Sequence, residues 1–476
     1  MSMNIDNRRT KIVCTMGPAS MNEKTLVEMM KAGMNVARVN FSHGDDKSHE
    51  DTINIVRECS KKAGKNIGVL MDLKGPKIRV GKFENGKIHV KKGDVLTAYT
   101  NDILGNSKEF SIKQPELFVD VKSGDTLLVD DGKVVLKVLD SSKTKMTVEV
   151  QNEGDISDNK GINAPGVILT MPFVSKKDYN DLIFGVEHQV NAVACSFVRR
   201  ADDVKQIRTI LDINGGQDIE IIAKIENQEG VDNIKSIIEA ADGVMVARGD
   251  MGVELPFELV PVYQKRIIQL CNEMGKPVIT ATHMLESMIH CPRPTRAEAG
   301  DVANAVLDGT DAVMLSGESA VGEYPVESVE TMVKIIKEIE KTTDYEAKYN
   351  ELAQHNRKDI NDAIGVSVAS SCLSLNKCYA VFAFTDTGGT AKRISHYRPC
   401  EPIIALAPSD RTAERLSYYW GVYPIIVKRT EKFEDFDIIS REVAKQIGLK
   451  KGDIVVQTSG FGVEHGQTNT VRLLEL

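Results

Sequence analysis

Eight short apolar segments, most of them followed by an amphipathic stretch, constrain the fold of this chain more than any other feature. They are Thr10–Gly17, Asn35–Phe41, Ile67–Leu73, Asn191–Val198, Glu220–Glu226, Gly243–Asp250, Pro277–Met284 and Asp311–Glu318. Strand-like segments that alternate with helical periods, such as Glu23–Ala32 and Ala201–Ile213, are typical of parallel βαβ units. Eight such units that close on themselves predict an α/β fold of the (β/α)8 TIM barrel type.

The alternation is interrupted once, between about Pro76 and Met171. Turn signals at Asn85-Gly86 and Asp131-Gly132 separate short alternating runs there, and no helical period is present. This pattern predicts an all-β domain inserted after the third barrel strand. Because it follows the carboxyl end of a strand, where such barrels have their active sites, we expect it to act as a lid.

From about Tyr345 a new series of strands and helices begins, which predicts a C-terminal α/β domain with a mostly parallel sheet. We therefore expect a barrel of residues 1–75 and 172–345, a lid of residues 76–171 and a C-terminal domain of residues 346–476. A chain of 476 residues is consistent with this division, since single cores rarely grow so large.

Composition excludes several classes of function. The chain is 42% hydrophobic and 27% charged, as soluble globular proteins are. No apolar run is long enough to cross a bilayer, and the first ten residues lack the apolar core of a signal peptide. The net charge of -8 argues against nucleic acid or an anionic membrane as partner, although a local basic pocket can still bind an anionic substrate. The eight cysteines form no metal-binding spacing, and we expect them to be reduced thiols in the cytoplasm.

Charged and polar residues stand at the carboxyl ends of most predicted barrel strands, the positions from which such barrels draw catalytic groups. They are Arg38, Asn40, Ser42, His43, Asp72, Lys74, Lys77, Arg79, Lys224, Glu226, Arg248, Asp250, Thr282, Ser316 and Glu318. A charge in an apolar strand is costly unless it is paired or bound to an ion. Any one of them could form a structural ion pair, but together they predict carboxylates for a divalent metal and cations for a phosphate.

Lys224 and Glu226 share one face of their predicted strand, because they are two residues apart. Glu226 and Asp250, from the neighbouring strand, offer the hard oxygen ligands that Mg²⁺ prefers. A lysine beside them suits a phosphoryl group in transfer, with a plain Lys–Glu ion pair as the alternative. The glycines of Ala247–Gly252 let backbone N–H groups approach a ligand closely, which suits a carboxylate.

A second loop, Thr385–Thr390, follows a predicted strand of the C-terminal domain and opens a helix with Lys392 and Arg393. Its hydroxyls, free amides and helix N-terminus predict an anion site. An ordinary glycine-rich turn is the alternative.

Several of these segments resemble the signature segments of the pyruvate kinase family, in order from about Thr10 to the last residues. They are Asn40–Gly44, Asp72–Pro76, Lys224–Asn227, Ala247–Asp250, Pro294–Glu298 and Asp311–Glu318. The resemblance implies transfer of the phosphoryl group of phosphoenolpyruvate to ADP, giving pyruvate and ATP, the final step of glycolysis. It also implies Mg²⁺ or Mn²⁺ as cofactor, a phosphorylated allosteric effector and a cytoplasmic homotetramer. The resemblance is to the bacterial type without an extra C-terminal phosphoenolpyruvate-utilising domain.

The resemblance also implies a role for each matching residue. Lys224 would stabilise the transferring phosphoryl group, and Glu226 and Asp250 would hold the divalent metal. By the same resemblance, the amides of Ala247, Gly249 and Asp250 would bind the substrate carboxylate, and Thr282 and Ser316 would lie on the proton route to the enolate carbon. Arg38 and Arg79 would contact phosphate oxygens, and Asn40, His43 and Lys160 would lie on the nucleotide side. The effector would be bound by Thr385, Thr387, Gly388, Gly389 and Thr390. Ser459–Thr470 resembles a second effector loop, in which Glu464 disfavours a bisphosphate.

The family's monovalent-cation site corresponds to Asn40, Ser42, Asp72 and the carbonyl of Leu73. Lys77 stands where potassium-dependent members have glutamate, and its ammonium can supply the charge of the ion. Leu73 and Val80 also resemble the lysine-type members, whereas Lys74 resembles the other type. The sequence thus predicts that K⁺ is not required. His283 stands where many relatives have glutamine, and we have no account of it.

Two other functions share part of this pattern. A barrel aldolase or lyase, with Lys224 as a Schiff base or with Mg²⁺ stabilising a pyruvate enolate, would also use Glu226 and Asp250. It leaves the lid and the basic residues Lys77, Arg79 and Lys160 without a role. A non-catalytic metabolite sensor would require degraded catalytic residues, and here they are intact.

Overall fold

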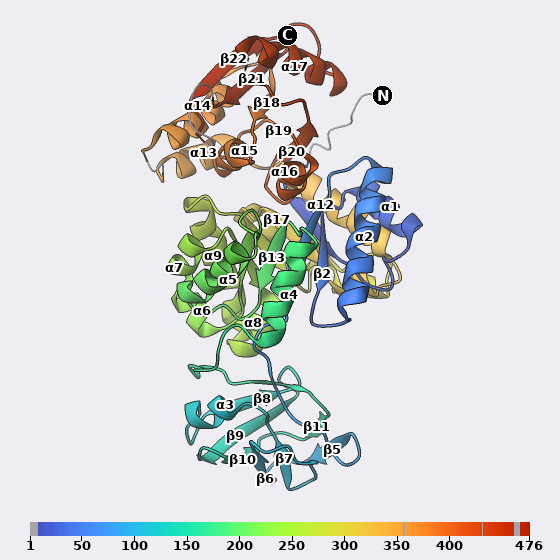
Figure 1. Cartoon of the computed structure of the whole chain (residues 1–476), viewed down its shortest axis with the longest axis vertical. Coiled ribbons are helices and arrows are strands. Elements are labelled where there is room, and N and C mark those ends of the chain that lie inside the picture. Colours follow the sequence, from blue (N-terminus) through green and yellow to red (C-terminus); the bar gives the residue numbers. More distant parts are fainter. Residues whose placement is uncertain (1–7, 356–357, 431, 461–466) are drawn as a thin grey trace.

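A computed structural model describes residues 8–355, 358–430, 432–460 and 467–476. Figure 1 shows three bodies stacked along the long axis of the molecule, with the lid at one end, the barrel in the middle and the C-terminal domain at the other end. In the part of the chain that the structure describes, no helix combines the length and the apolarity that a bilayer crossing requires.

The central body is a closed barrel of eight parallel strands in the order β1-β17-β16-β15-β14-β13-β3-β2. Its strands are β1 (Lys11–Thr15), β2 (Val36–Asn40), β3 (Gly68–Asp72), β13 (Ala192–Cys195), β14 (Glu220–Ile225), β15 (Gly243–Ala247), β16 (Val278–Ala281) and β17 (Ala312–Leu315). Each predicted segment contains one of them, so the barrel prediction is confirmed. Strands that are buried on both faces consist mostly of consecutive apolar residues, which explains why these segments could be recognised in the sequence.

Helices surround the barrel, and several of them begin at a capping side chain. They are α1 (Glu23–Ala32), α2 (Asp46–Ala63), α4 (Lys176–Glu187), α5 (Ala201–Ile213), α6 (Gln228–Asp232), α7 (Ile234–Ala240), α8 (Arg248–Glu254), α9 (Val260–Glu273), α10 (Arg296–Asp308), α11 (Gly317–Ala320) and α12 (Pro325–Glu340), with short 3₁₀ turns at Phe257–Leu259 and Glu286–Ile289. In α2 a capping box joins Asp45 and Ser48, and Gly64 ends the helix in the left-handed conformation.

The insert after β3 is built from a seven-stranded sheet, β4-β12-β8-β9-β10-β6-β7, and a two-stranded sheet, β11-β5. The strands are β4 (Ile78–Arg79), β5 (Lys87–Val90), β6 (Val95–Tyr99), β7 (Glu109–Ser111), β8 (Thr126–Val129), β9 (Val134–Ser141), β10 (Lys145–Val150), β11 (Gly154–Ser157) and β12 (Gly161–Asn163). One short helix, α3 (Pro115–Asp120), departs from the expected all-β composition. Its six residues bury Leu117 and Phe118 but are too few to produce a helical period.

The C-terminal domain has a five-stranded sheet in the order β20-β19-β18-β21-β22, parallel except for the edge strand β22. Its strands are β18 (Cys378–Phe384), β19 (Ile403–Ala407), β20 (Val422–Ile426), β21 (Ile454–Ser459) and β22 (Thr470–Glu475), and its helices are α13 (Tyr345–Ala353), α14 (Ile360–Ser374), α15 (Gly389–His396), α16 (Asp410–Arg415) and α17 (Phe433–Gln446). This confirms the mostly parallel sheet.

The lid and the C-terminal domain lie at opposite ends of the barrel (Figure 1). The lid leaves the barrel after β3, at the carboxyl ends of the strands. The C-terminal domain contacts the amino ends, where the ammonium of Lys11 donates a 2.6 Å hydrogen bond to the carbonyl of Val422. The predicted domain boundaries at 75/76 and 171/172 fall between strands of different sheets, whereas 345/346 falls after the first residue of helix α13; all three stay predictions.

Candidate active site

A chain of charges links three barrel strands at their carboxyl ends. Arg38 Nε lies 2.6 Å from Asp72 Oδ2, and Lys224 Nζ lies 3.2 Å from Asp72 Oδ1 and 2.9 Å from Glu226 Oε1. The Lys224 ammonium also donates a 2.7 Å hydrogen bond to Ser196 Oγ. The structure therefore brings together four of the predicted residues, and it adds Ser196.

The charges in this cluster stabilise one another in a buried setting. Burial alone would raise the pKa of Asp72, but Arg38 and Lys224 outweigh it and lower that pKa below its usual value. Burial alone would lower the pKa of Lys224, but Asp72 and Glu226 outweigh it and raise the pKa. Lys224 is therefore a fixed positive charge at neutral pH, which makes it unsuited to the free-amine chemistry of a Schiff base.

Glu226, one of the two residues expected to hold a divalent metal, has a buried carboxylate that the protein satisfies only in part. Glu226 Oε2 accepts a 2.6 Å hydrogen bond from the backbone N–H of Phe197, which lies in the left-handed region with φ of 57°. Glu226 Oε1, apart from its contact with Lys224, is buried without a hydrogen-bond partner. Burial, with a smaller contribution from the charge of Asp250, raises the pKa of Glu226 to about 7. A carboxylate that is buried and only partly satisfied gains from binding a cation.

These two carboxylates are too few to complete a metal site alone. Within the described ranges, no cluster of three or more His, Cys, Asp and Glu side chains is arranged to hold a metal ion. Mg²⁺ held by these two carboxylates would therefore need further oxygen ligands, which substrate and water usually supply in phosphoryl-transfer sites.

The first turn of α8 contains the residues that were expected to bind a carboxylate. The helix starts at Arg248, and its N-cap residue Ala247 has no side chain that accepts from the first N–H groups. One of them, Gly249 N–H, donates a 2.7 Å hydrogen bond to Thr282 Oγ1. A Cβ at Gly249 would lie 3.3 Å from that oxygen, so the close approach favours glycine.

Arg248 follows the end of a strand, but its side chain forms structural hydrogen bonds. Its guanidinium donates to the carbonyls of Ala281 and Thr282, at 3.1 and 2.5 Å, and to Asp301 Oδ1 at 2.7 Å. It thereby holds the turn after β16 against α10. Thr282 and His283 both have positive φ in that turn, 65° and 53°. Two consecutive non-glycine residues in this region store strain of the kind found at functional sites.

Ser316 and Glu318 follow β17, the strand that pairs with β16. Ser316 Oγ is buried without a hydrogen-bond partner. Glu318 accepts hydrogen bonds from the backbone N–H groups of Ser316 and Leu285, at 2.7 and 2.9 Å, so it joins the turns that follow β16 and β17. Ser316 thus offers an unused hydroxyl, whereas Glu318 has a structural role.

The residues predicted on the nucleotide side divide between barrel and lid. Asn40 Oδ1 accepts a 3.1 Å hydrogen bond from Ser42 N–H, and His43 is exposed nearby on the barrel. Lys160 Nζ lies 2.9 Å from Asp130 Oδ1, and Arg79 donates a 2.7 Å hydrogen bond to the carbonyl of Asn159. The last two therefore make their contacts within the lid.

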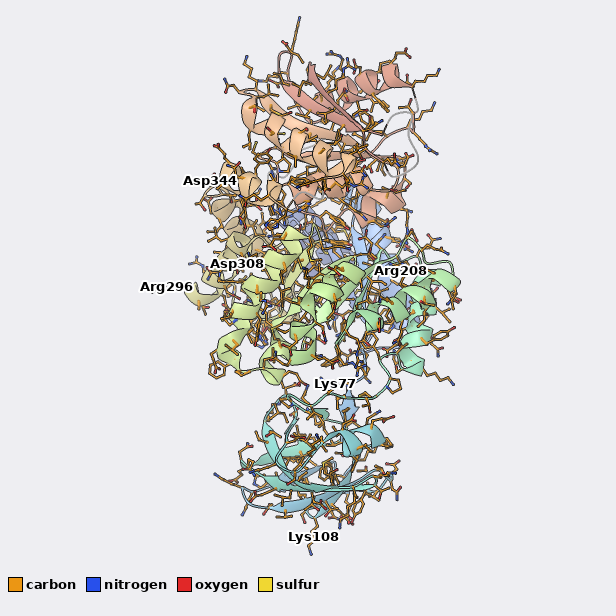
Figure 2. The ribbon with its side chains drawn as sticks, turned by 90° about the vertical axis from the view of Figure 1, so that its left-hand side faces the viewer. Lys77, Lys108, Arg208, Arg296, Asp308 and Asp344 are labelled. Atoms are coloured by element: carbon orange, nitrogen blue, oxygen red, sulfur yellow. The ribbon has the colours of Figure 1, made fainter. Side chains whose placement is uncertain are left out.

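Lys77 lies between the barrel and the lid (Figure 2). Its Nζ is 3.8 Å from Asp131 Oδ1 of the lid, and its side chain packs where a Cβ at Gly161 would stand. Of the predicted monovalent-cation ligands, Asp72 is paired with Arg38 and Lys224, and the carbonyl of Leu73 accepts a 2.8 Å hydrogen bond from Ser196.

Two residue pairs were missed by sequence reasoning. Ser196 and Phe197 directly follow β13, so the strand-end rule could have found them. Asn163 and Glu254 could not be found this way, because one lies in the lid and the other at the end of α8. Asn163 Nδ2 donates a 2.6 Å hydrogen bond to Glu254 Oε1 and so links lid and barrel.

The predicted anion loop of the C-terminal domain is an open turn before α15. Gly388, with φ of 95°, precedes the helix and donates a 3.0 Å hydrogen bond to Thr385 Oγ1. Thr387 is exposed. Arg429 lies 3.0 Å from Asp386 and brings a cation to the loop. Glu464, in the second predicted effector loop, lies outside the described residues.

The chain is similar to one family along most of its length. The profile described as "Pyruvate kinase, barrel domain" matches residues 7–329, and "Pyruvate kinase, alpha/beta domain" matches residues 362–474. Pyruvate kinase of Clostridium perfringens is 47% identical over 474 residues, which cover 98% of this chain and 99% of that protein. Pyruvate kinase of Bacillus licheniformis is 46% identical over 471 residues, which cover 98% of this chain and 80% of that protein. A solved pyruvate kinase structure from Cryptosporidium parvum superposes with a TM-score of 0.94 at 38% identity, covering 98% of this chain and 96% of that one.

Proposed function

The chain belongs to the pyruvate kinase family, and from that premise we propose how its residues perform the reaction. The reaction is transfer of the phosphoryl group of phosphoenolpyruvate to ADP, which gives pyruvate and ATP. The family uses a divalent metal. Each part of this reaction has a candidate side chain at the carboxyl face of the barrel.

Lys224 carries the proposal, because its buried ammonium is held charged by Asp72 and Glu226 at the carboxyl end of β14. Phosphoryl transfer needs little covalent help from the protein and depends on positioning and on charge stabilisation. A preorganised cation in a site sheltered from water stabilises the charge on the transferring group without reorganising. Arg38, anchored by Asp72 and Thr15, adds a second cation beside it.

The metal and the substrate carboxylate take neighbouring places. Glu226 and Asp250 would hold Mg²⁺ or Mn²⁺, which supplies positive charge to phosphate and enolate oxygens. The amides at the start of α8, from Ala247 to Asp250, would bind the carboxylate of phosphoenolpyruvate. Because Asp250 belongs to this same turn, the substrate carboxylate and the metal would bind next to each other.

Proton delivery completes the reaction, since the enol released by phosphoryl transfer must become a ketone. Thr282 Oγ1 and the unpartnered Ser316 Oγ stand at the ends of the adjacent strands β16 and β17. We assign these hydroxyls to the route by which a proton reaches the enolate carbon. Asn40, His43, Arg79 and Lys160 would bind ADP when the lid closes.

Three finer properties belong to the same proposal. Potassium is not required, because Lys77 supplies a fixed charge at the hinge between barrel and lid. A phosphorylated metabolite binds the loop Thr385–Thr390 and raises substrate affinity. The enzyme works as a homotetramer in the cytoplasm, where glycolysis supplies its substrates.

A coupled assay of ADP-dependent pyruvate formation with Mg²⁺ tests the function directly. Pyruvate must form from phosphoenolpyruvate only when ADP is present, with ATP in equal amount. An aldolase or lyase that used Lys224 as a Schiff base would instead be trapped covalently by borohydride in the presence of pyruvate. Trapping at Lys224, or pyruvate formation without ADP, would contradict the proposal.

A further inference from the structure

Helix α15 and the turn that follows it contact the barrel at the amino ends of two strands. Lys392, in the first turns of α15, pairs through Nζ with Oε1 of Glu220, the first residue of β14. Arg398, two residues beyond the end of α15, lies 3.0 Å through Nη2 from Oδ2 of Asp311, the residue before β17. Figure 1 shows the domain that contains α15 against the end of the barrel opposite the lid.

Glu220 is held by the C-terminal domain from several sides. Its side chain is 4% exposed. Tyr419 O–H lies 3.2 Å from each of its carboxylate oxygens, and Arg415 Nη2 lies 3.6 Å from Oε1. A buried carboxylate with these contacts is strongly constrained in position, because moving it away from its cations would leave an uncompensated charge.

Asp311 is fixed in the same manner and extends the contact to a third strand. Its Oδ2 also accepts a 3.0 Å hydrogen bond from the backbone N–H of Val278, the first residue of β16. Arg398 donates further hydrogen bonds to Asn272 Oδ1 and to the carbonyl of Gly309, at 2.9 and 3.1 Å. Its guanidinium lies 4.8 Å from the centre of the Trp420 ring. The amino ends of β16 and β17 are thus tied to one arginine of the C-terminal domain.

The opposite ends of these strands carry the chemistry. β14 ends in the segment with Lys224 and Glu226, β16 leads to Thr282, and β17 leads to Ser316. Glu220 and Lys224 are four residues apart, or about 13 Å along an extended strand. Every residue of β14 is buried, and the strand is hydrogen-bonded to β13 and β15. A strand packed this densely transmits a displacement of one end to the other.

We propose that Glu220 and Asp311 are positioning residues of the active site, through which Lys392 and Arg398 of the C-terminal domain set the places of Lys224, Glu226, Thr282 and Ser316. The proposal rests on the catalytic roles assigned above. It also gives the anion loop a route to the barrel, since the backbone N–H of Lys392 donates a 3.0 Å hydrogen bond to the carbonyl of Gly388 in that loop. A ligand that displaced Gly388 would also displace Lys392, and would thereby change the ion pair between Lys392 and Glu220.

The test is a double-mutant cycle on the full-length enzyme with Glu220→Gln, Lys392→Met and the double variant. Steady-state kcat and KM for phosphoenolpyruvate are measured at saturating ADP and Mg²⁺, together with the thermal midpoint. We expect each single variant to lower kcat at least fivefold, and the double variant to be no slower than the slower single one, because both remove the same contact. Lys392→Arg should recover most of the lost kcat, since it keeps the charge.

The pair Arg411 and Asp218 is the matched control. It also joins the two domains, with Nε 2.7 Å from Oδ2, and Asp218 lies only two residues before Glu220 but outside β14. Asp218→Asn should lower the thermal midpoint while kcat stays within twofold of the parent. A similar fall in kcat for Asp218→Asn would show that any loosened domain contact slows the enzyme, and would overturn the proposal.

Two further outcomes decide the remaining cases. Folded Glu220→Gln and Lys392→Met enzymes with parental kcat and KM would refute the positioning role. If Glu220→Gln fails to fold, the half-buried Lys392→Met variant decides alone, by the same criteria. If Lys224→Met retains phosphoryl transfer, the catalytic assignment fails. This result does not depend on how the Glu220 variants behave.

Discussion

Lys224 Nζ lies 3.2 Å from Asp72 Oδ1, although 152 residues separate the two along the chain. The contact joins β14 to β3 across the intervening strand β13, and the hydroxyl of Ser196, the residue after β13, lies 2.7 Å from the same ammonium. Three strands thus share one lysine, which fixes where its positive charge stands. This fixed charge is the basis of the first prediction.

We expect Lys224→Met to lower phosphoryl transfer at least about a thousandfold, the order expected when a preorganised charge is removed from such a site. Exchange of the methyl protons of pyruvate with solvent should persist, because Thr282 and Ser316 are untouched. Transfer is followed by the coupled assay and exchange by NMR. Lys235→Met, at an exposed lysine of α7, is the control and should behave as the parent. Near-normal transfer in Lys224→Met would remove the basis of the mechanism.

The second prediction concerns potassium. In tetramethylammonium buffer free of K⁺ and NH₄⁺, the enzyme should work at nearly its full rate with Mg²⁺, since Lys77 supplies the fixed charge that offsets the anionic substrates. Lys77→Glu should be slow in that buffer and should recover when K⁺ is added. Parental activity that rises many-fold with K⁺ would show that the lysine does not replace the ion.

For the anion loop we expect Thr387→Glu to abolish activation by phosphorylated metabolites. The added carboxylate lies on an exposed position of the loop and repels a phosphate. The measurement is the ratio of KM for phosphoenolpyruvate without and with each sugar phosphate or nucleotide, which should fall to one. Thr387→Ser serves as control and should keep the ratio of the parent. If no phosphometabolite changes the parent's KM, the loop is an ordinary turn.

Assembly is tested at the edge strand β22. Leu473 of β22 and Ile438 of α17 are 51% and 56% exposed in the isolated chain, and an open apolar edge of this kind needs cover. We expect a tetramer by light scattering at micromolar concentration, and smaller species for Leu473→Glu. A monomeric parent would contradict the homotetramer.

The lid should show its own pH dependence through His89. Hydrogen bonds to Asp155 first, and then to Glu153, raise the pKa of His89 above 6.5. Because the folded-state pKa is raised, His89 contributes stability in full below pH 6.5, and this contribution is lost as the pH rises through the folded-state pKa. NMR titration should place the pKa of His89 above 6.5, and Asp155→Asn should lower it. An unshifted pKa in the parent would disprove the interaction in solution.

The fold was predictable because its signals are local. Barrel strands buried on both faces produce continuous apolar runs, and Glu23–Ala32 and its counterparts show a helical period, so neighbouring residues suffice to find them. The strand-end rule then placed Arg38, Asp72, Lys224 and Glu226 at one site, because the carboxyl ends of parallel strands meet at one face of a barrel. Helix α3, which the all-β prediction for the lid missed, has too few residues for a period.

What the sequence by itself determined is therefore the order of elements, the closed barrel and the set of polar residues at its carboxyl face, all of which depend on short-range patterns. Only the tertiary structure decided how those residues are used. It turned Arg248 and Glu318 toward backbone groups and placed Ser196 beside Lys224. It also paired Glu220 with Lys392, 172 residues further along the chain. Such contacts form when barrel closure and domain packing bring segments together that are far apart along the chain. A local pattern of side chains carries no information about which distant segment will become its neighbour.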